Sequence, residues 1–131
     1  MRSIYIAGHT GLVGSALLRR FSARPGLKVI LAGRAKLDLL EPQAVERFLK
    51  SEKPEAVIIA AGRVGGISAN SANPAEFIYE NLMIEANLIH GSWKAGVGRL
   101  LNFGSSCMYP KEAAQPMRRE VEPTSPVCPA M

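Results

Sequence analysis

Gly8-His9-Thr10-Gly11-Leu12-Val13-Gly14 decides the fold, because it lies directly between a strand pattern and a helix pattern. Residues 3–7 (Ser-Ile-Tyr-Ile-Ala) are apolar and rich in strand formers, whereas apolar side chains recur at helical spacing from Leu12 to Phe21. In a strand–turn–helix unit of this kind the first glycine allows a tight bend, the second allows backbone to approach a pyrophosphate, and the third allows close packing of helix on strand. The stretch therefore predicts a nucleotide-binding turn.

The spacing G-x-x-G-x-x-G differs by one residue from the dinucleotide fingerprint G-x-G-x-x-G, so the motif alone is weak evidence. Its place directly after one strand favours a nucleotide site over a purely structural turn. The variant spacing resembles the turn of the extended short-chain dehydrogenases/reductases. We expect the following residues of the turn and of the helix start to bind the cofactor: Gly8, Thr10, Gly11, Leu12, Val13 and Gly14.

Composition argues against several other classes of function. The 131-residue chain has the length of one domain, and its net charge of +5 comes from basic residues that are scattered apart from Arg19-Arg20 and Arg118-Arg119. Aromatic residues do not alternate with these basic residues, so we expect no nucleic-acid binding. We find no span-length apolar stretch and no signal peptide, which predicts a cytoplasmic protein without membrane contact. Cys107 and Cys128 fit neither a disulfide framework nor a zinc site, so we expect no metal.

The second predicted strand, over residues 27–31, bears on the choice of cofactor. An NAD site usually places an acidic residue roughly 20 residues after the glycine turn, where it binds the ribose 2′-hydroxyl. This chain has Gly33-Arg34 at that point. Glycine leaves room and a guanidinium suits a 2′-phosphate, so we expect NADP, with a solvent-exposed loop arginine as the alternative. Asp38 and Leu39, which follow, are also expected at the cofactor site.

Two strand–helix–strand units in succession predict an α/β fold. Pro42 begins a predicted helix that continues over residues 43–52, and the continuous apolar run 56–61 predicts a strand covered on both faces. We expect an incomplete Rossmann-type doubly wound parallel sheet of about four strands, with helices on both faces. Right-handed crossovers are expected to place the third strand outside the second and to leave the first near the centre of the sheet.

Residues 62–73 follow the third strand as a long glycine-rich stretch. Ligands bind at the carboxyl ends of strands in open α/β sheets, so we expect a loop that contacts substrate and cofactor. Pro74 then begins a predicted long helix that continues to about Lys94. The side chains expected to face mostly inward are Phe77, Leu82, Ile84, Ala86, Leu88 and Ile89.

The fourth predicted strand, residues 99–103, runs into a polar segment. A serine at the carboxyl end of a central strand can hydrogen-bond a carbonyl substrate, and a partly exposed cysteine can act as an acid or base, which makes Ser105 and Cys107 catalytic candidates. A polar loop without a catalytic role fits the spacing about as well. We also expect the end of this strand to complete the cofactor site with Phe103, Gly104, Ser105 and Ser106.

Four segments together resemble the GDP-L-fucose synthases, which are GDP-4-keto-6-deoxy-D-mannose epimerase/reductases. The segments are residues 8–16, 63–70, 77–87 and 104–111. The resemblance implies NADPH bound at the glycine turn, at Arg34 and at the end of the fourth strand. It also implies a GDP-linked 4-keto sugar that is epimerised at C3 and C5 before reduction at C4. In that scheme Ser105 hydrogen-bonds the C4 oxygen and Cys107 exchanges the carbon-bound protons.

The chain departs from this family toward its end. None of Tyr5, Tyr79 or Tyr109 has a lysine four residues on, so the family's Tyr-x-x-x-Lys pair is absent. We expect residues 1–115 to form a partial NAD(P)-binding domain, and residues 116–131, which hold four of the nine prolines, to form an irregular tail. Such a truncated or frame-shifted chain is expected to lack the reductive step and to hold GDP-sugar poorly.

Two other functions remain open at this point. One is a non-catalytic NADP-binding module, and the other is a different NAD(P)-dependent sugar-nucleotide epimerase or dehydratase. The resemblance implies a homodimer for full-length relatives. We expect the fourth strand to lie beside the first without a fifth strand to cover its other edge, which predicts self-association of this chain.

Overall fold

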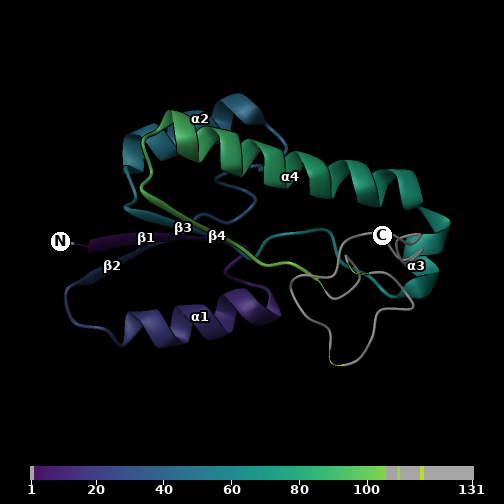
Figure 1. Ribbon diagram of the computed structural model, residues 1–131, viewed down its shortest axis with the longest axis horizontal. Helices are drawn as coiled ribbons and strands as arrows, with labels where there is room; N and C mark the ends of the chain where they lie inside the picture. The colour runs from purple at the N-terminus through teal and green to yellow at the C-terminus, as the bar shows by residue number, and fades with distance from the viewer. Residues whose placement is uncertain (1, 106–108, 110–115, 117–131) are drawn as a thin grey trace.

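Four parallel strands form the centre of the computed structural model: β1 (Arg2–Ala7), β2 (Leu27–Ile30), β3 (Ala56–Ile59) and β4 (Arg99–Asn102) (Figure 1). The structure describes residues 2–105, 109 and 116. The strand order is β2-β1-β3-β4, and each neighbouring pair is parallel. The predicted Rossmann-type parallel α/β sheet is confirmed.

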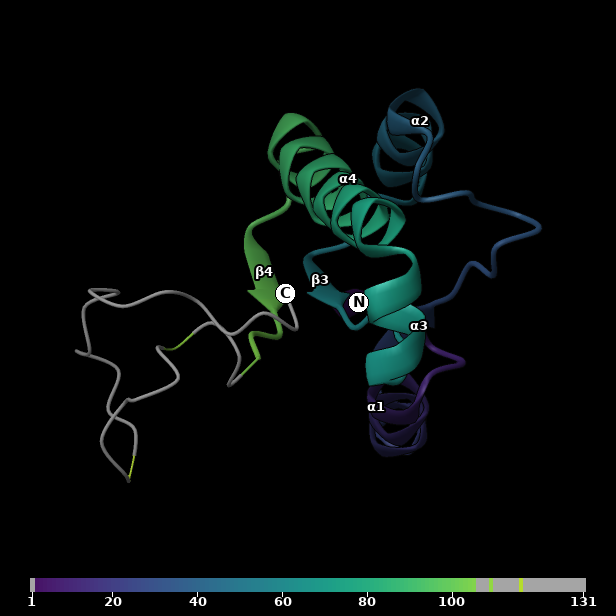
Figure 2. The ribbon, with the colours of Figure 1, turned by 90° about the vertical axis from the view of Figure 1, so that its right-hand side faces the viewer.

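Helices cover both faces of this sheet (Figures 1 and 2). α1 (Leu12–Ser22) lies on one face, whereas α2 (Pro42–Glu52) and α4 (Pro74–Lys94) lie side by side on the other. The short helix α3 (Ile67–Ala72) precedes α4. The prediction of a loop over residues 62–73 is wrong for these six residues. Gly66 and Ala69 accept hydrogen bonds from backbone N–H groups four residues on, which closes helical turns.

The predicted place of the third strand is also wrong, because β3 pairs with β1 on the edge opposite β2. Parallel crossovers are right-handed, so the direction of each crossover depends on the face that its helix covers. α1 connects β1 to β2 across one face. α2 covers the opposite face, and its crossover therefore runs back past β1 to β3 (Figure 1). For the same reason β4 lies beside β3 and not, as expected, beside β1.

The core lies between the sheet and the α2–α4 pair. Strand side chains alternate between faces, and Tyr5 and Ala7 of β1 point toward α2 and α4. Val45 and Leu49 of α2 and Leu88 of α4 are fully buried against them. These contacts hold α2 on its side of the sheet. They therefore also set the direction of the crossover from β2 through α2 to β3.

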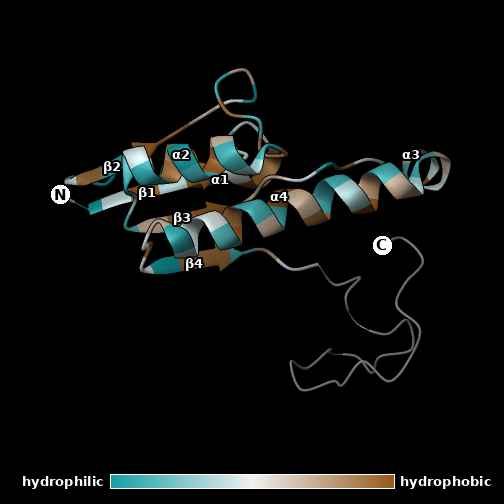
Figure 3. Cartoon of the chain, turned by 90° about the horizontal axis from the view of Figure 1, so that it is seen from above, coloured by the Kyte–Doolittle hydropathy of each residue, from teal (hydrophilic) through white to brown (hydrophobic). Residues whose placement is uncertain are grey.

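The predicted inward face of α4 is only partly correct. Phe77 and Leu88 are buried and Ile84 packs against the core, but Leu82, Ile89 and Ala86 are exposed. The helix carries a second apolar stripe at helical spacing, and its members are Ile78, Leu82, Ile89 and Trp93. Helical periodicity identifies both stripes equally well, and only the packing against α2 and the sheet decides which one is covered. Figure 3 shows hydrophobic residues along the outer surface of α4.

Strand β4 forms one edge of the sheet. All four of its residues are exposed, and within the described part of the chain it pairs only with β3. The exposed fractions of Leu100 and Leu101 are 39% and 49%. Self-association through this edge stays a prediction. Among the described residues, no helix is both long enough and apolar enough to span a membrane.

Tyr5 carries a buried hydroxyl at the centre of the core. Its ring packs against Phe48 with centroids 4.9 Å apart, and within the described residues its Oη atom has no hydrogen-bond partner. Burial raises the pKa of the Tyr5 phenol well above its ordinary value of 10.0. An unsatisfied buried hydroxyl destabilises the folded state.

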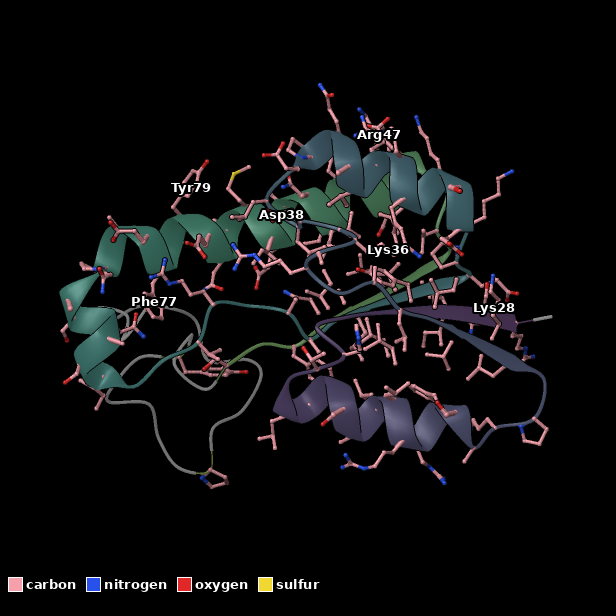
Figure 4. The ribbon with its side chains drawn as sticks, turned by 180° about the vertical axis from the view of Figure 1, so that it is seen from behind. Lys28, Lys36, Asp38, Arg47, Phe77 and Tyr79 are labelled. Carbon is pink, nitrogen blue, oxygen red and sulfur yellow. The ribbon has the colours of Figure 1, made fainter. Side chains whose placement is uncertain are left out.

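We predict that Tyr5→Phe raises the free energy of unfolding by about 1–3 kcal/mol, because it removes the unpaired hydroxyl and keeps the ring. Urea denaturation of the two proteins measures the difference. Tyr79→Phe is the matched control, because Tyr79 is 62% exposed on α4 and points outward (Figure 4). A loss of stability in Tyr5→Phe would show that the Tyr5 hydroxyl has a partner in solution.

Glu46 of α2 forms ion pairs with Lys50 of the same helix and with Lys94 of α4. It accepts hydrogen bonds from Lys50 Nζ at 2.7 Å and from Lys94 Nζ at 3.0 Å. These bonds, first that of Lys50, lower the pKa of Glu46 from 4.5 to about 2. A depressed folded-state pKa stabilises the fold above the ordinary pKa of the group and ceases to do so as the pH falls through the depressed value.

We therefore predict that the Glu46 contribution is complete above pH 4.5 and is lost progressively toward pH 2. Acid titration of Glu46→Gln by circular dichroism should show a shallower fall in stability over this range than the parent protein shows. Glu76→Gln, at an exposed glutamate of α4 without an ion pair in the described part, is the control. Parallel titration curves for Glu46→Gln and the parent protein would contradict the assignment.

Candidate functional site

The chain bends at Gly8, where β1 ends. Its φ of +81° lies in the region that favours glycine. A Cβ atom at Gly8 would also lie 2.6 Å from the Ala60 carbonyl oxygen and from backbone atoms of Ala61, just beyond β3. Gly14, in the first turn of α1, packs on Gly8 from another side, and a Cβ atom there would overlap the Gly8 carbonyl oxygen. The packing of the protein itself thus requires the first and third glycines.

Gly11 is under no such constraint. Its φ of −75° and ψ of 175° suit any residue, and the nearest atom to a Cβ atom at this position would be the Gly8 carbonyl oxygen at 3.4 Å. Gly11 is the N-cap of α1, which has no side-chain cap and no acidic residue in its first turn. The first N–H groups of the helix and its positive dipole end are therefore available to an anion. The Leu12 side chain in this turn is 91% exposed.

A pocket of about 570 Å³ opens beside this turn, at the carboxyl ends of β1, β2 and β3. Its walls are the glycine turn, the segment after β2, the segment after β3 and part of α4. Figure 4 labels Asp38, which lies in the segment after β2. The lining residues are Gly8, His9, Thr10, Gly11, Ala32, Gly33, Arg34, Leu37, Asp38, Leu39, Leu40, Ala60, Ala61, Gly62, Arg63, Glu80 and Ile84.

The pocket gathers part of the predicted cofactor site. The predicted residues that line it are Gly8, Thr10, Gly11, Arg34, Asp38 and Leu39. Leu12, Val13 and Gly14 follow directly as the first turn of α1 but do not line the pocket. Glu80 and Ile84 line the pocket from α4 and were not among the predicted residues. Their only sequence signal is their place in the family-like segment 77–87.

The two arginines that line the pocket differ in their partners. The Arg63 guanidinium and the Glu80 carboxylate form an ion pair with 2.6 Å between Nη1 and Oε1. Asp38 accepts the Leu40 backbone N–H at 3.0 Å through Oδ1, which fixes its carboxylate locally. Arg34 is exposed and forms no ion pair within the described part of the chain. A Cβ atom at Gly33 would meet no atom within 4 Å, so there is open space beside this arginine.

The segment that holds the catalytic candidates Ser105 and Cys107 follows β4, whose carboxyl end lies on the same side of the sheet as those of β1, β2 and β3. In the register of the sheet Asn102 pairs with Ile59, and Phe103, Gly104 and Ser105 continue beyond it as exposed residues. Ser106 and Cys107 lie outside the described residues. Among the described residues, His, Cys, Asp and Glu side chains form no group of three or more that could hold a metal ion.

The fold is that of the doubly wound α/β proteins, and the pocket lies where such sheets bind dinucleotides. Residues 4–130 match the NAD dependent epimerase/dehydratase family. The chain therefore belongs to that family.

Individual relatives narrow the comparison. A GDP-L-fucose synthase of Sinorhizobium fredii is 54% identical over 128 residues, which is 98% of this chain and 40% of the relative. The GDP-L-fucose synthase of Escherichia coli is 49% identical over 114 residues, 87% of this chain and 36% of the relative. The resemblance to GDP-L-fucose synthases is confirmed. The chain spans about 40% or less of the length of these two relatives.

Solved structures agree with the sequence relatives. MlghC, a GDP-mannoheptose C4 reductase from Campylobacter jejuni with NADP bound, matches with a TM-score of 0.92 at 43% identity. The match covers 98% of this chain and 38% of that chain. A GDP-6-OMe-4-keto-L-xylo-heptose reductase from C. jejuni matches with a TM-score of 0.90 at 44% identity, over 96% of this chain and 36% of that chain.

The different constraints on the glycines generate a prediction. Gly11→Ala should leave thermal stability close to that of the parent protein but weaken dinucleotide binding, because the new methyl group would lie where the backbone is expected to approach the pyrophosphate. Gly14→Ala should lower stability by about 1–3 kcal/mol through overpacking against Gly8. Thermal unfolding and NADP⁺ titration of both variants separate the two effects. Equal destabilisation by the two variants, or unchanged binding in Gly11→Ala, would contradict this division of roles.

Proposed function

We propose that this chain is the NADP-binding part of a GDP-L-fucose synthase, which converts GDP-4-keto-6-deoxy-D-mannose to GDP-L-fucose with NADPH. One observation carries the proposal: the glycine turn and Arg34, which forms no ion pair among the described residues, open into a single pocket, with no acidic residue where β2 ends. The identity of 54% to a GDP-L-fucose synthase supports the choice of substrate.

The residues of the pocket fit the parts of NADP. The pyrophosphate would lie at the N-terminus of α1, where Gly11 leaves the backbone accessible. The 2′-phosphate would lie in the open space at Gly33, within reach of the Arg34 guanidinium. Asp38 and Leu39 would border the adenosine end. The walls supplied by Ala60, Ala61 and Gly62 are apolar or small and leave room for the rest of the dinucleotide.

The proposed chemistry assigns two roles beyond cofactor binding. Bound NADPH supplies the hydride for C4 of the sugar. Ser105, at the carboxyl edge of the sheet, hydrogen-bonds the C4 oxygen. That ketone acidifies the C–H bonds at C3 and C5, and Cys107 removes those protons as the base, which requires a lowered thiol pKa. A separate acid then returns a proton to the opposite face, so that each carbon inverts. The tyrosine–lysine pair that gives a proton to the C4 oxygen in the family has no match in these 131 residues.

A GDP-linked keto heptose is a second candidate substrate. Its support is the match at 43–44% identity to two GDP-heptose reductases. Both candidates share the GDP moiety and the keto sugar, so they share the cofactor and the site. A competition experiment between GDP-4-keto-6-deoxy-D-mannose and a GDP-4-keto heptose for the NADP-loaded protein would show which of the two binds with the higher affinity.

The NADP assignment is tested by isothermal titration with NADPH and NADH. We expect NADPH to bind more tightly, and Arg34→Ala to weaken NADPH binding by about ten- to a hundredfold with little effect on NADH, because one hydrogen bond to a charged group contributes about 1.5–3 kcal/mol. Arg24→Ala, at an exposed arginine outside the pocket lining, is the control. Equal affinities for the two cofactors, or an unchanged affinity ratio in Arg34→Ala, would overturn the assignment.

A further inference from the structure

The side chain of Asn81, on α4, holds the segment after β3 through its backbone. Its Oδ1 atom accepts the Arg63 backbone N–H at 2.7 Å, and its Nδ2 atom donates to the Arg63 carbonyl oxygen at 3.0 Å. One side chain thus satisfies both backbone polar groups of a residue 18 positions away. Only a carboxamide carries an acceptor and a donor in this arrangement, which requires Asn or Gln here.

Neighbouring side chains reinforce the same attachment. Besides its ion pair with Glu80, the Arg63 guanidinium lies 4.6 Å from the centre of the Phe77 ring. Glycines permit the close approach: a Cβ atom at Gly62 would lie 3.1 Å from Asn81 Oδ1, and one at Gly65 would lie 3.0 Å from Phe77 Cζ. The glycine-rich segment after β3 and the start of α4 therefore form one interlocked unit.

Asn87, further along α4, holds the segment after β2, which forms the other side of the pocket. It is buried, and its Nδ2 atom donates to the Leu39 carbonyl oxygen at 2.9 Å across 48 residues of sequence. Leu39 belongs to the segment after β2, whose residues 37–40 all line the pocket. Within the described part of the chain, the backbone hydrogen bonds of this segment close local turns, such as that from Lys36 N–H to Gly33 O at 2.9 Å. One helix thus anchors both walls.

We infer that Asn81 and Asn87 are positioning residues for the cofactor, because their amides fix the two facing walls of the dinucleotide pocket. Asn81 fixes the wall at Gly62 and Arg63, and Asn87 fixes the wall at residues 37–40. This inference rests on the proposed binding of NADP. Segment 77–87 resembles the GDP-L-fucose synthases, although it lies on a helix and not at a strand end, where ligands bind. The inference gives a physical reason for the two asparagines in this segment.

The two anchors should differ in which part of the cofactor they affect. The Asn87 wall adjoins Arg34, where the 2′-phosphate is proposed to bind, so its loss should reduce the preference for NADP⁺ over NAD⁺. The Asn81 wall lies across the pocket, next to the ends of β1 and β3. Its loss should weaken both cofactors equally and leave the affinity ratio unchanged. A role only in folding would alter stability and not this ratio.

Titration of NADP⁺ and NAD⁺ into Asn81→Asp and Asn87→Asp tests the inference. Each substitution keeps an acceptor and removes the donor, and we expect about tenfold weaker NADP⁺ binding, the equivalent of one hydrogen bond. Asn70→Asp, on α3, is the matched control, because the Asn70 side chain forms no hydrogen bond among the described residues. Affinities in both folded variants equal to that of Asn70→Asp would overturn the inference.

Hydrogen exchange at the Arg63 amide separates the inference from the proposed function. In the parent protein and in Asn81→Asp the amide should be protected, because an acceptor remains, and in Asn81→Ala it should exchange faster. Unchanged protection in a folded Asn81→Ala would overturn the Asn81 anchor whether or not NADP⁺ binds. If Asn81→Ala does not fold, Asn81→Leu replaces it. A parent protein that binds neither cofactor would contradict the proposed function alone.

Discussion

The close packing around the backbone of Gly8 is the constraint on which the rest of the structure depends. The end of β3 lies so near that a Cβ atom at Gly8 would be 2.6 Å from Ala60 and Ala61, and α1 packs on the other side through Gly14. The Ala60 N–H also donates to the Ala7 carbonyl oxygen at 3.0 Å, which continues the pairing of β1 and β3 to the bend. Because these three segments meet without side chains between them, the N-terminus of α1 faces the carboxyl edge of the sheet.

The place of the pocket follows from the direction of the crossovers. α1 leads away from β1 on one face, and α2 and α4 lie on the other, so connections diverge between β1 and β3. In doubly wound sheets a crevice for ligands forms at such a point. The residues that line the pocket follow β1, β3 and the neighbouring β2, together with Glu80 and Ile84 of α4.

α4 connects the core to the site. Leu88 packs under α2 and the sheet, and Gly91 permits close contact, since a Cβ atom there would lie 3.2 Å from Leu49. The same helix sends Asn81 and Asn87 to the backbones of the two pocket walls. The packing of α4 in the core therefore also fixes the position of the two pocket walls that Asn81 and Asn87 hold. The exposed stripe of α4 around Leu82 and Trp93 and the edge of β4 take no part in this arrangement.

The sequence alone determined what depends on neighbouring residues: the strand–turn–helix unit at Gly8, the other strands and long helices, and the arginine without an acidic neighbour at the end of β2. These follow from local periodicity and from the chemistry of single side chains. Tertiary structure alone decided the strand order, the covered stripe of α4 and the attachment of Asn81 to Arg63. Right-handed crossovers leave the direction open until a helix packs on one face, and hydrogen bonds across 18 or 48 residues leave no periodic signal in one sequence.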